Sequence, residues 1–133
     1  IAYLRRSVEC WYGKPVIRRP TNLLKCLILS ICERSRCHHM ENEVKFIGIR
    51  HSGGMDTKTL EAYLRNLGTG IWEIVLHPGT GVLNDESGFQ KSAVRWMRST
   101  GRRLEWDALV SETVRVALEE ADITTLRFAD LNR

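Results

Sequence analysis

The chain has 133 residues, of which 43% are hydrophobic and 27% charged, a composition typical of one soluble globular domain and not of a disordered chain. No apolar run approaches the roughly 20 residues that a membrane span needs, so we expect no membrane span. The net charge of +4 comes from scattered basic residues without a recognisable nucleic-acid-binding module. We therefore expect a solvated surface and no nucleic acid partner.

The first third of the chain predicts two helices and one strand. The first 20 residues predict a short helix, a turn, and a brief strand at Val16 and Ile17 that ends at Arg18. Helical spacing then predicts a helix within Leu23–Cys37, with apolar residues at positions 23, 24, 27, 28 and 31. Because the chain begins at Ile1, without an initiator methionine or a secretory signal, we expect a fragment or a processed product.

The middle of the chain alternates strands and helices. Lys45–Ile49 predicts a second strand, and Ile71–Leu76 predicts a third because its β-branched and aromatic residues suit a buried strand. Between them, Asp56 predicts the N-cap of a helix that Gly68 ends. The apolar residues of this helix follow the i, i+3, i+4, i+7 rule, and they are Leu60, Tyr63, Leu64 and Leu67.

The last third predicts further helices and a closing strand. A helical segment follows a polar loop and runs to about Thr100, Ser111 predicts the cap of the last helix, and Thr124–Phe128 predicts a strand. This order indicates an α/β fold with about four parallel strands and crossover helices. Such a sheet corresponds to half of a TIM-like (β/α) barrel, and we expect residues 1–133 to form this one domain.

The four cysteines indicate a reducing compartment. All of them lie in the first 37 residues, without the spacing of a small disulfide scaffold, so we expect a cytoplasmic protein. Cys32 and Cys37, with His38 and His39 behind them, are residue types that could hold zinc. Adjacent histidines seldom both reach one ion, so we favour the alternative that these are buried thiols near a polar loop.

Polar residues follow three predicted strands at their carboxyl ends. Arg18 follows the first strand, Arg50, His51 and Ser52 follow the second, and His77 follows the third at a Pro-Gly turn. In parallel α/β folds the carboxyl ends of the strands carry ligands and chemistry, so these side chains indicate an active-site rim. The alternative is that each cluster only completes a turn, and that the His77 side chain forms a hydrogen bond at a strand terminus.

Four segments of the chain carry a family resemblance. They are FIGIRHSGGM at Phe46–Met55, GIWEIVLHPG at Gly70–Gly79, RLEWDAL at Arg103–Leu109 and LRFADL at Leu126–Leu131. Together they resemble the carboxyl-terminal half of the YdjC-like carbohydrate deacetylases, and most of all the HpnK-like branch associated with hopanoid biosynthesis. The resemblance covers residues 14–131.

The resemblance implies a (β/α) barrel hydrolase that removes N-acetyl groups from an amino sugar or glycolipid. It implies a divalent metal cofactor, zinc or magnesium, held by one aspartate and two histidines. It places the family's His-Pro-Gly histidine at His77, as a general acid for the leaving amine. It implies that Arg18, Arg50, His51 and Ser52 bind the substrate or shape the rim.

The metal-binding motifs of that family, an Asp-Asp and a His-x-His, would precede Ile1, so we expect no metal ligands in this chain and no activity from it alone. The alternative is a non-catalytic remnant or sugar-binding module, and a third possibility is a basic domain that binds nucleic acid. Half a barrel leaves sheet edges unpaired and apolar surface exposed. We therefore expect a marginally stable chain that self-associates or pairs with the missing amino-terminal half.

Overall fold

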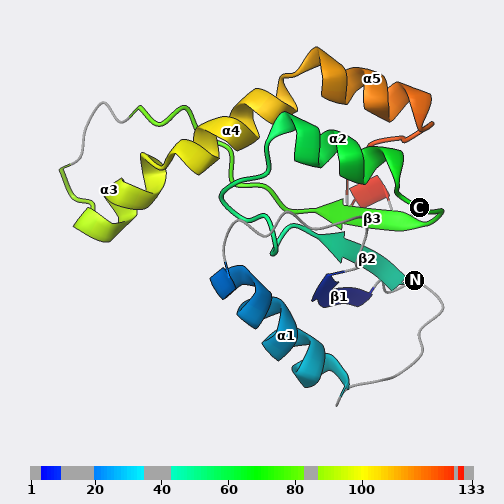
Figure 1. The fold of residues 1–133 in the computed structure, drawn as a ribbon, viewed down its shortest axis with the longest axis horizontal. Helices are drawn as coiled ribbons and strands as arrows, with labels where there is room; N and C mark the ends of the chain where they lie inside the picture. Colours follow the sequence, from blue (N-terminus) through cyan, green and yellow to red (C-terminus); the bar gives the residue numbers. More distant parts are fainter. Residues whose placement is uncertain (1–3, 10–19, 35–42, 83–86, 128, 131–133) are drawn as a thin grey trace.

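The computed structural model of the protein describes residues 4–9, 20–34, 43–82, 87–127 and 129–130. Three strands in these ranges form one parallel sheet in the order β1-β2-β3. They are β1 (Leu4–Glu9), β2 (Glu43–Ile47) and β3 (Ile71–Ile74). Helix α1 (Pro20–Arg34) lies between β1 and β2 in the chain, and α2 (Thr57–Arg65) lies between β2 and β3. The fold is therefore of the α/β class (Figure 1).

Three more helices follow the sheet, α3 (Lys91–Met97), α4 (Thr100–Leu109) and α5 (Glu112–Glu120). Figure 1 shows α4 and α5 beside α2, whereas α1 lies next to β1 and α3 stands apart from the rest. Helix α3 buries none of its residues. No helix in the described part of the chain has the length and apolar character to cross a membrane.

Side-chain caps explain where α2 and α5 begin. Asp56 precedes α2 and accepts a hydrogen bond on Oδ1 from the Thr59 backbone N–H at 3.0 Å. Ser111 precedes α5, and its hydroxyl accepts from the Val114 N–H at 3.4 Å. Both predicted caps are confirmed. Helix α2 ends earlier than Gly68, with Asn66 as its C-cap.

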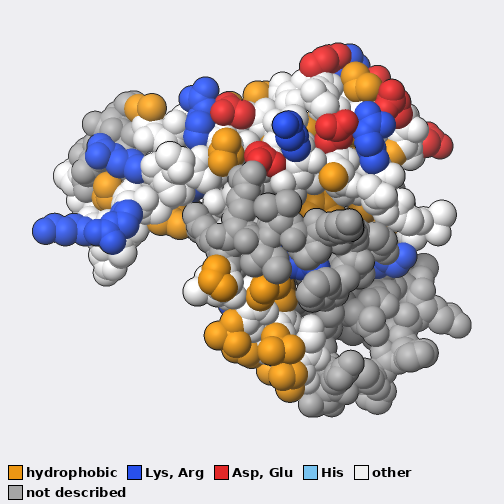
Figure 2. All heavy atoms as spheres, in the orientation of Figure 1, with side chains coloured by type: hydrophobic (Ala, Val, Ile, Leu, Met, Phe, Trp, Pro, Cys, Tyr) orange, Lys and Arg blue, Asp and Glu red, His pale blue; other side chains and the backbone are white. Residues whose placement is uncertain are grey.

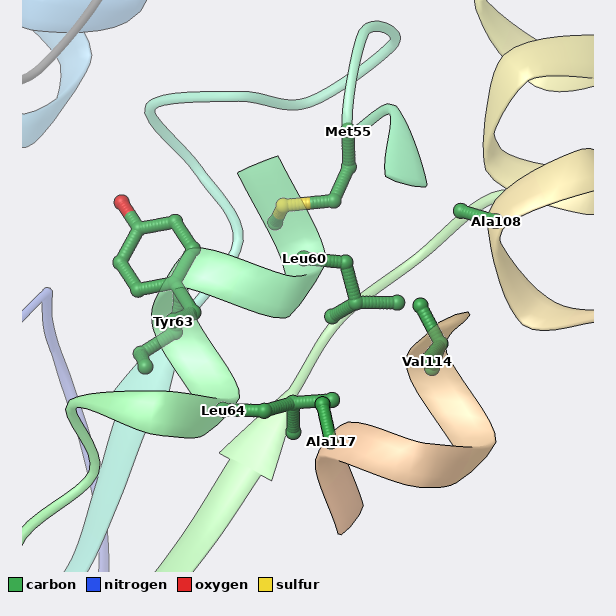
Figure 3. Packing of buried hydrophobic residues seen from close by; sticks show 8 residues of the cluster. Met55, Leu60, Tyr63, Leu64, Ala108, Val114 and Ala117 are labelled. Carbon is green, nitrogen blue, oxygen red and sulfur yellow. The ribbon is translucent and has the colours of Figure 1, made fainter. Parts of the chain in front are cut away.

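The hydrophobic core lies between α2, α4, α5 and the sheet. Ile47 of β2 is fully buried, and it packs in a cluster of buried side chains from these elements and from the segment just before α2. The other members are Met55, Leu60, Tyr63, Leu64, Ala108, Val114 and Ala117 (Figure 3). The α2 residues that helical spacing marked as one apolar face therefore do face the core. This packing fixes the carboxyl end of β2 relative to α2.

Helix α1 presents an apolar stripe to solvent, which we define as Leu24, Leu27, Ile28 and Ile31. These residues recur at the spacing of one helix face, and each exposes more than half of its side chain. Figure 2 shows apolar side chains gathered over the lower end of the molecule, where α1 lies. The spacing predicted this helix correctly, but the face that it marks is not part of the core.

Two predictions near the ends of the chain are wrong. Leu4–Glu9 was expected to be helical, but it forms β1 because its backbone pairs in parallel with β2. Thr124–Arg127 was expected to begin a fourth strand, but these residues form none. All four are exposed, so they have no buried face to hold them against the sheet. The expected strand at Val16 and Ile17 lies outside the described residues.

Candidate functional site

Strands β2 and β3 continue side by side into two turns at their carboxyl ends. Beyond β3, the Val75 N–H donates to the Ile47 carbonyl at 2.9 Å. Gly48 has a φ of +142°, and a Cβ at this position would lie 2.5 Å from the Val75 carbonyl oxygen, so the close approach requires glycine. We call residues 49–54 the serine turn and residues 77–79 the histidine turn. The predicted site residue Arg18 lies outside the described residues.

The serine turn buries two of the predicted site residues. Arg50 is 5% exposed and His51 is 9% exposed. The His51 ring meets the Tyr63 ring edge to face, with 5.5 Å between the ring centroids. From the first turn of α1, the Asn22 side-chain amide donates to the Arg50 carbonyl at 3.1 Å and to the Ser52 carbonyl at 3.4 Å. Side chains of both α1 and α2 thus contact this turn.

The histidine turn is held by α4 and carries an exposed imidazole. Arg102 Nη2 donates to the Pro78 carbonyl at 2.9 Å, and the Gly79 N–H donates to the Arg102 carbonyl at 3.1 Å. The Arg102 guanidinium lies 4.1 Å from the centroid of the Trp96 ring, a cation–π contact. His77 is exposed, and its ring centroid is 6.0 Å from that of Trp96. The turn is therefore fixed while its histidine side chain faces solvent.

Two cavities lie at these turns and share Ser52. The first, of about 180 Å³, is lined by residues 50–54 of the serine turn together with Asn22, Thr100, Gly101 and Leu104. The second, of about 420 Å³, is lined by Ser52 and His77 with Lys25, Ile28, Leu29, Gly48, Ile49 and Val75. The structure thus places Ser52 and His77 on one cavity and places Arg50 and His51 on the adjoining one.

Glu105 of α4 joins the two turns, although the sequence analysis assigns no role to this residue. Its side chain is 1% exposed. Oε1 accepts from the backbone N–H groups of Gly53 at 2.7 Å and Gly54 at 3.1 Å, and Oε2 accepts from the His77 N–H at 2.5 Å. A buried carboxylate needs such donors because it has left water. The only signal for Glu105 in the sequence was its place within the RLEWDAL segment of the resemblance.

The described residues do not fit the zinc or magnesium ion that the resemblance implies. Within the ranges that the structure covers, no three histidine, cysteine, aspartate or glutamate side chains come together as metal ligands would. Of the possible zinc group in the sequence, Cys32 is an exposed free thiol, so the expectation of a buried thiol is wrong at this position. Cys37, His38 and His39 lie outside the described residues. No metal chemistry is therefore assigned to the described part of the chain.

Comparisons of the chain with protein families, with curated proteins and with solved structures found no match. The family resemblance therefore rests on the sequence segments alone, and the candidate site rests on the geometry of the two turns.

Proposed function

We propose that this chain forms one wall of a carbohydrate N-deacetylase site, with an amino sugar or a glycolipid as substrate and with His77 as general acid. The cavity that Ser52 and His77 share is the observation that carries the proposal. It lies where parallel strands end, which is where α/β proteins bind their ligands. The exposure of the His77 side chain also supports the proposal, because a general acid must reach the substrate.

The residues of this wall suit the departure of the amine. Hydrolysis of an acetamide breaks the carbon–nitrogen bond, and the nitrogen must gain a proton to leave as an amine. An imidazolium donates that proton and regains one near neutral pH. The Ser52 hydroxyl on the same cavity both donates and accepts hydrogen bonds, which suits a sugar hydroxyl. Arg50 and His51 are buried, so we assign them to shaping the rim.

Replacing His77 with alanine tests the proposed role. The chain is co-expressed with the amino-terminal half of a YdjC-like deacetylase, and acetate release from an N-acetylglucosamine oligosaccharide is measured with zinc or magnesium added. Loss of the general acid is expected to lower the rate at least about a hundredfold. The matched control is Thr80→Ala, because Thr80 is exposed just after the histidine turn and does not line the shared cavity. We expect this variant to keep the full rate.

Two outcomes would overturn the proposal. Unchanged acetate release from His77→Ala would remove the general acid. Oligosaccharide binding without acetate release from the joined halves would favour the alternative, a sugar-binding module without hydrolase activity.

The apolar stripe of α1 supports the expectation that the isolated chain self-associates. Exposed contiguous apolar side chains favour association because contact removes them from water. Leu27 lies within the stripe, and Leu27→Glu is expected to shift the chain toward monomer in analytical ultracentrifugation. The control is Val82→Glu, since Val82 is 72% exposed and lies outside the stripe. A wild-type chain that stays monomeric at every concentration and melts sharply would contradict this expectation.

A cytoplasmic location is proposed from the cysteines. Cys32 is an exposed free thiol, as a reducing compartment would keep it.

A further inference from the structure

Helix α4 contacts both turns of the candidate site with one side of its first two helical turns. Gly101 lies so close to the serine turn that a Cβ would stand 1.9 Å from the Gly53 carbonyl oxygen. Arg102 holds the histidine turn through the Pro78 carbonyl and the Gly79 N–H. Glu105 follows Gly101 by four residues, on the same side of the helix, and its two carboxylate oxygens reach one turn each.

The chemistry of Glu105 suits this bridging position. Each of its three partners is a backbone N–H group, and an ionised carboxylate accepts hydrogen bonds without donating any. Charge-assisted bonds of this kind are among the strongest hydrogen bonds in proteins. In contrast, the hydrogen bonds of the Asn22 side chain reach the serine turn alone, and those of the Arg102 side chain reach the histidine turn alone.

We propose that Glu105 is a positioning residue that couples the serine turn to the histidine turn, so that Ser52 and His77 keep one geometry across their shared cavity. The His77 backbone N–H is hydrogen-bonded to the Glu105 carboxylate. This bond fixes the position of the His77 backbone, from which the imidazole side chain extends. The coupling deepens the proposed function, and its relevance to catalysis rests on that proposal. The coupling itself depends on the three hydrogen bonds.

Amide hydrogen exchange measured by NMR on the full chain tests the coupling. In the wild-type protein the amides of Gly53, Gly54 and His77 are expected to have protection factors within about threefold of one another, because the two turns open together. In Glu105→Gln the side chain presents an NH₂ donor to a backbone donor. Exchange is therefore expected to become at least about tenfold faster in both turns. Reference amides outside α4 and outside both turns, those of Leu60 and Arg115, should not change.

The matched control is Asp107→Asn on the same helix. Asp107 is exposed and pairs with Arg103 at 2.8 Å, away from both turns, so exchange in the turns should stay as in the wild type. Glu105→Asp keeps the charge but shortens the side chain, and it is expected to speed exchange in at least one turn. If Glu105→Gln does not fold, the exchange rates of the wild type and of Glu105→Asp test the coupling of the two turns.

Three results would overturn the coupling. They are unrelated protection of the two turns in the wild type, unchanged exchange in Glu105→Asp, and a rise in Glu105→Gln that is equal at every amide of the protein. The last result would mean that Glu105 only stabilises the fold. Since none of these readouts depends on acetate release, the coupling and the deacetylase proposal can fail separately.

Discussion

Replacement of Gly101 by alanine is expected to lower the free energy of unfolding by about 4 kcal/mol, which is near the upper end for one substitution. The added Cβ would lie 1.9 Å from the Gly53 carbonyl oxygen, and because that atom is backbone, α4 must move away from the serine turn. Alanine gains only about 1 kcal/mol over glycine in helix propensity, so the overlap decides the sign. The displacement would also break the hydrogen bonds of Glu105.

Urea denaturation followed by circular dichroism measures this loss. The matched control is Gly68→Ala, because Gly68 is exposed and an added Cβ there meets no atom within 4 Å. That substitution should change the free energy of unfolding by no more than about 0.5 kcal/mol. A Gly101→Ala variant with the denaturation midpoint of the wild type would mean that α4 does not pack on the serine turn as described.

The central part of the fold was predictable from the sequence because its local signals agree with its packing. Asp56 caps the helix that it was expected to cap, and the apolar spacing of α2 marks the face that is buried. The strands β2 and β3 each overlap the predicted strand. In contrast, β1 depends on pairing with β2, a contact between residues far apart in the sequence that no local pattern of Leu4–Glu9 contains.

Helix α4 was missing from the prediction because its large apolar residues do not occupy its buried positions. Its buried positions are occupied by Gly101, Glu105 and Ala108, none of which is a large apolar residue. Its large apolar residues, Leu104, Trp106 and Leu109, are all partly exposed. A search for apolar residues at helical spacing therefore finds no core-facing stripe here. The same reversal occurs in α1, whose apolar stripe faces solvent.

The candidate site was predictable in outline only. The rule that carboxyl ends of parallel strands meet placed Ser52 and His77 near each other, and the two residues do line one cavity. Burial could not be read from the sequence, and it separates Arg50 and His51 from that cavity. The role of Glu105 could not be read from the sequence either, because it depends on how α4 lies across two turns that follow different strands.

Replacement of Ile47 by alanine is the second large effect that we expect, a loss of about 3 kcal/mol in the free energy of unfolding. Ile47 is fully buried at the end of β2, where it contacts the core cluster beneath the serine turn. Removing its outer carbons loses the free energy gained by burying them. It also leaves a cavity, because close-packed neighbours relax only in part. Urea denaturation gives the magnitude, and the midpoint should fall without a change in slope.

Ile28→Ala makes the same chemical change in α1, where the side chain is 51% exposed. At a protein concentration where the chain is monomeric, much of that side chain is in water, so its removal should cost no more than about 0.5 kcal/mol. The difference between the two losses in the free energy of unfolding therefore shows which apolar face belongs to the core. Equal losses at Ile47 and Ile28 at that concentration would mean that the stripe of α1 is buried within the monomer, and the expectation of self-association through the stripe would then be wrong.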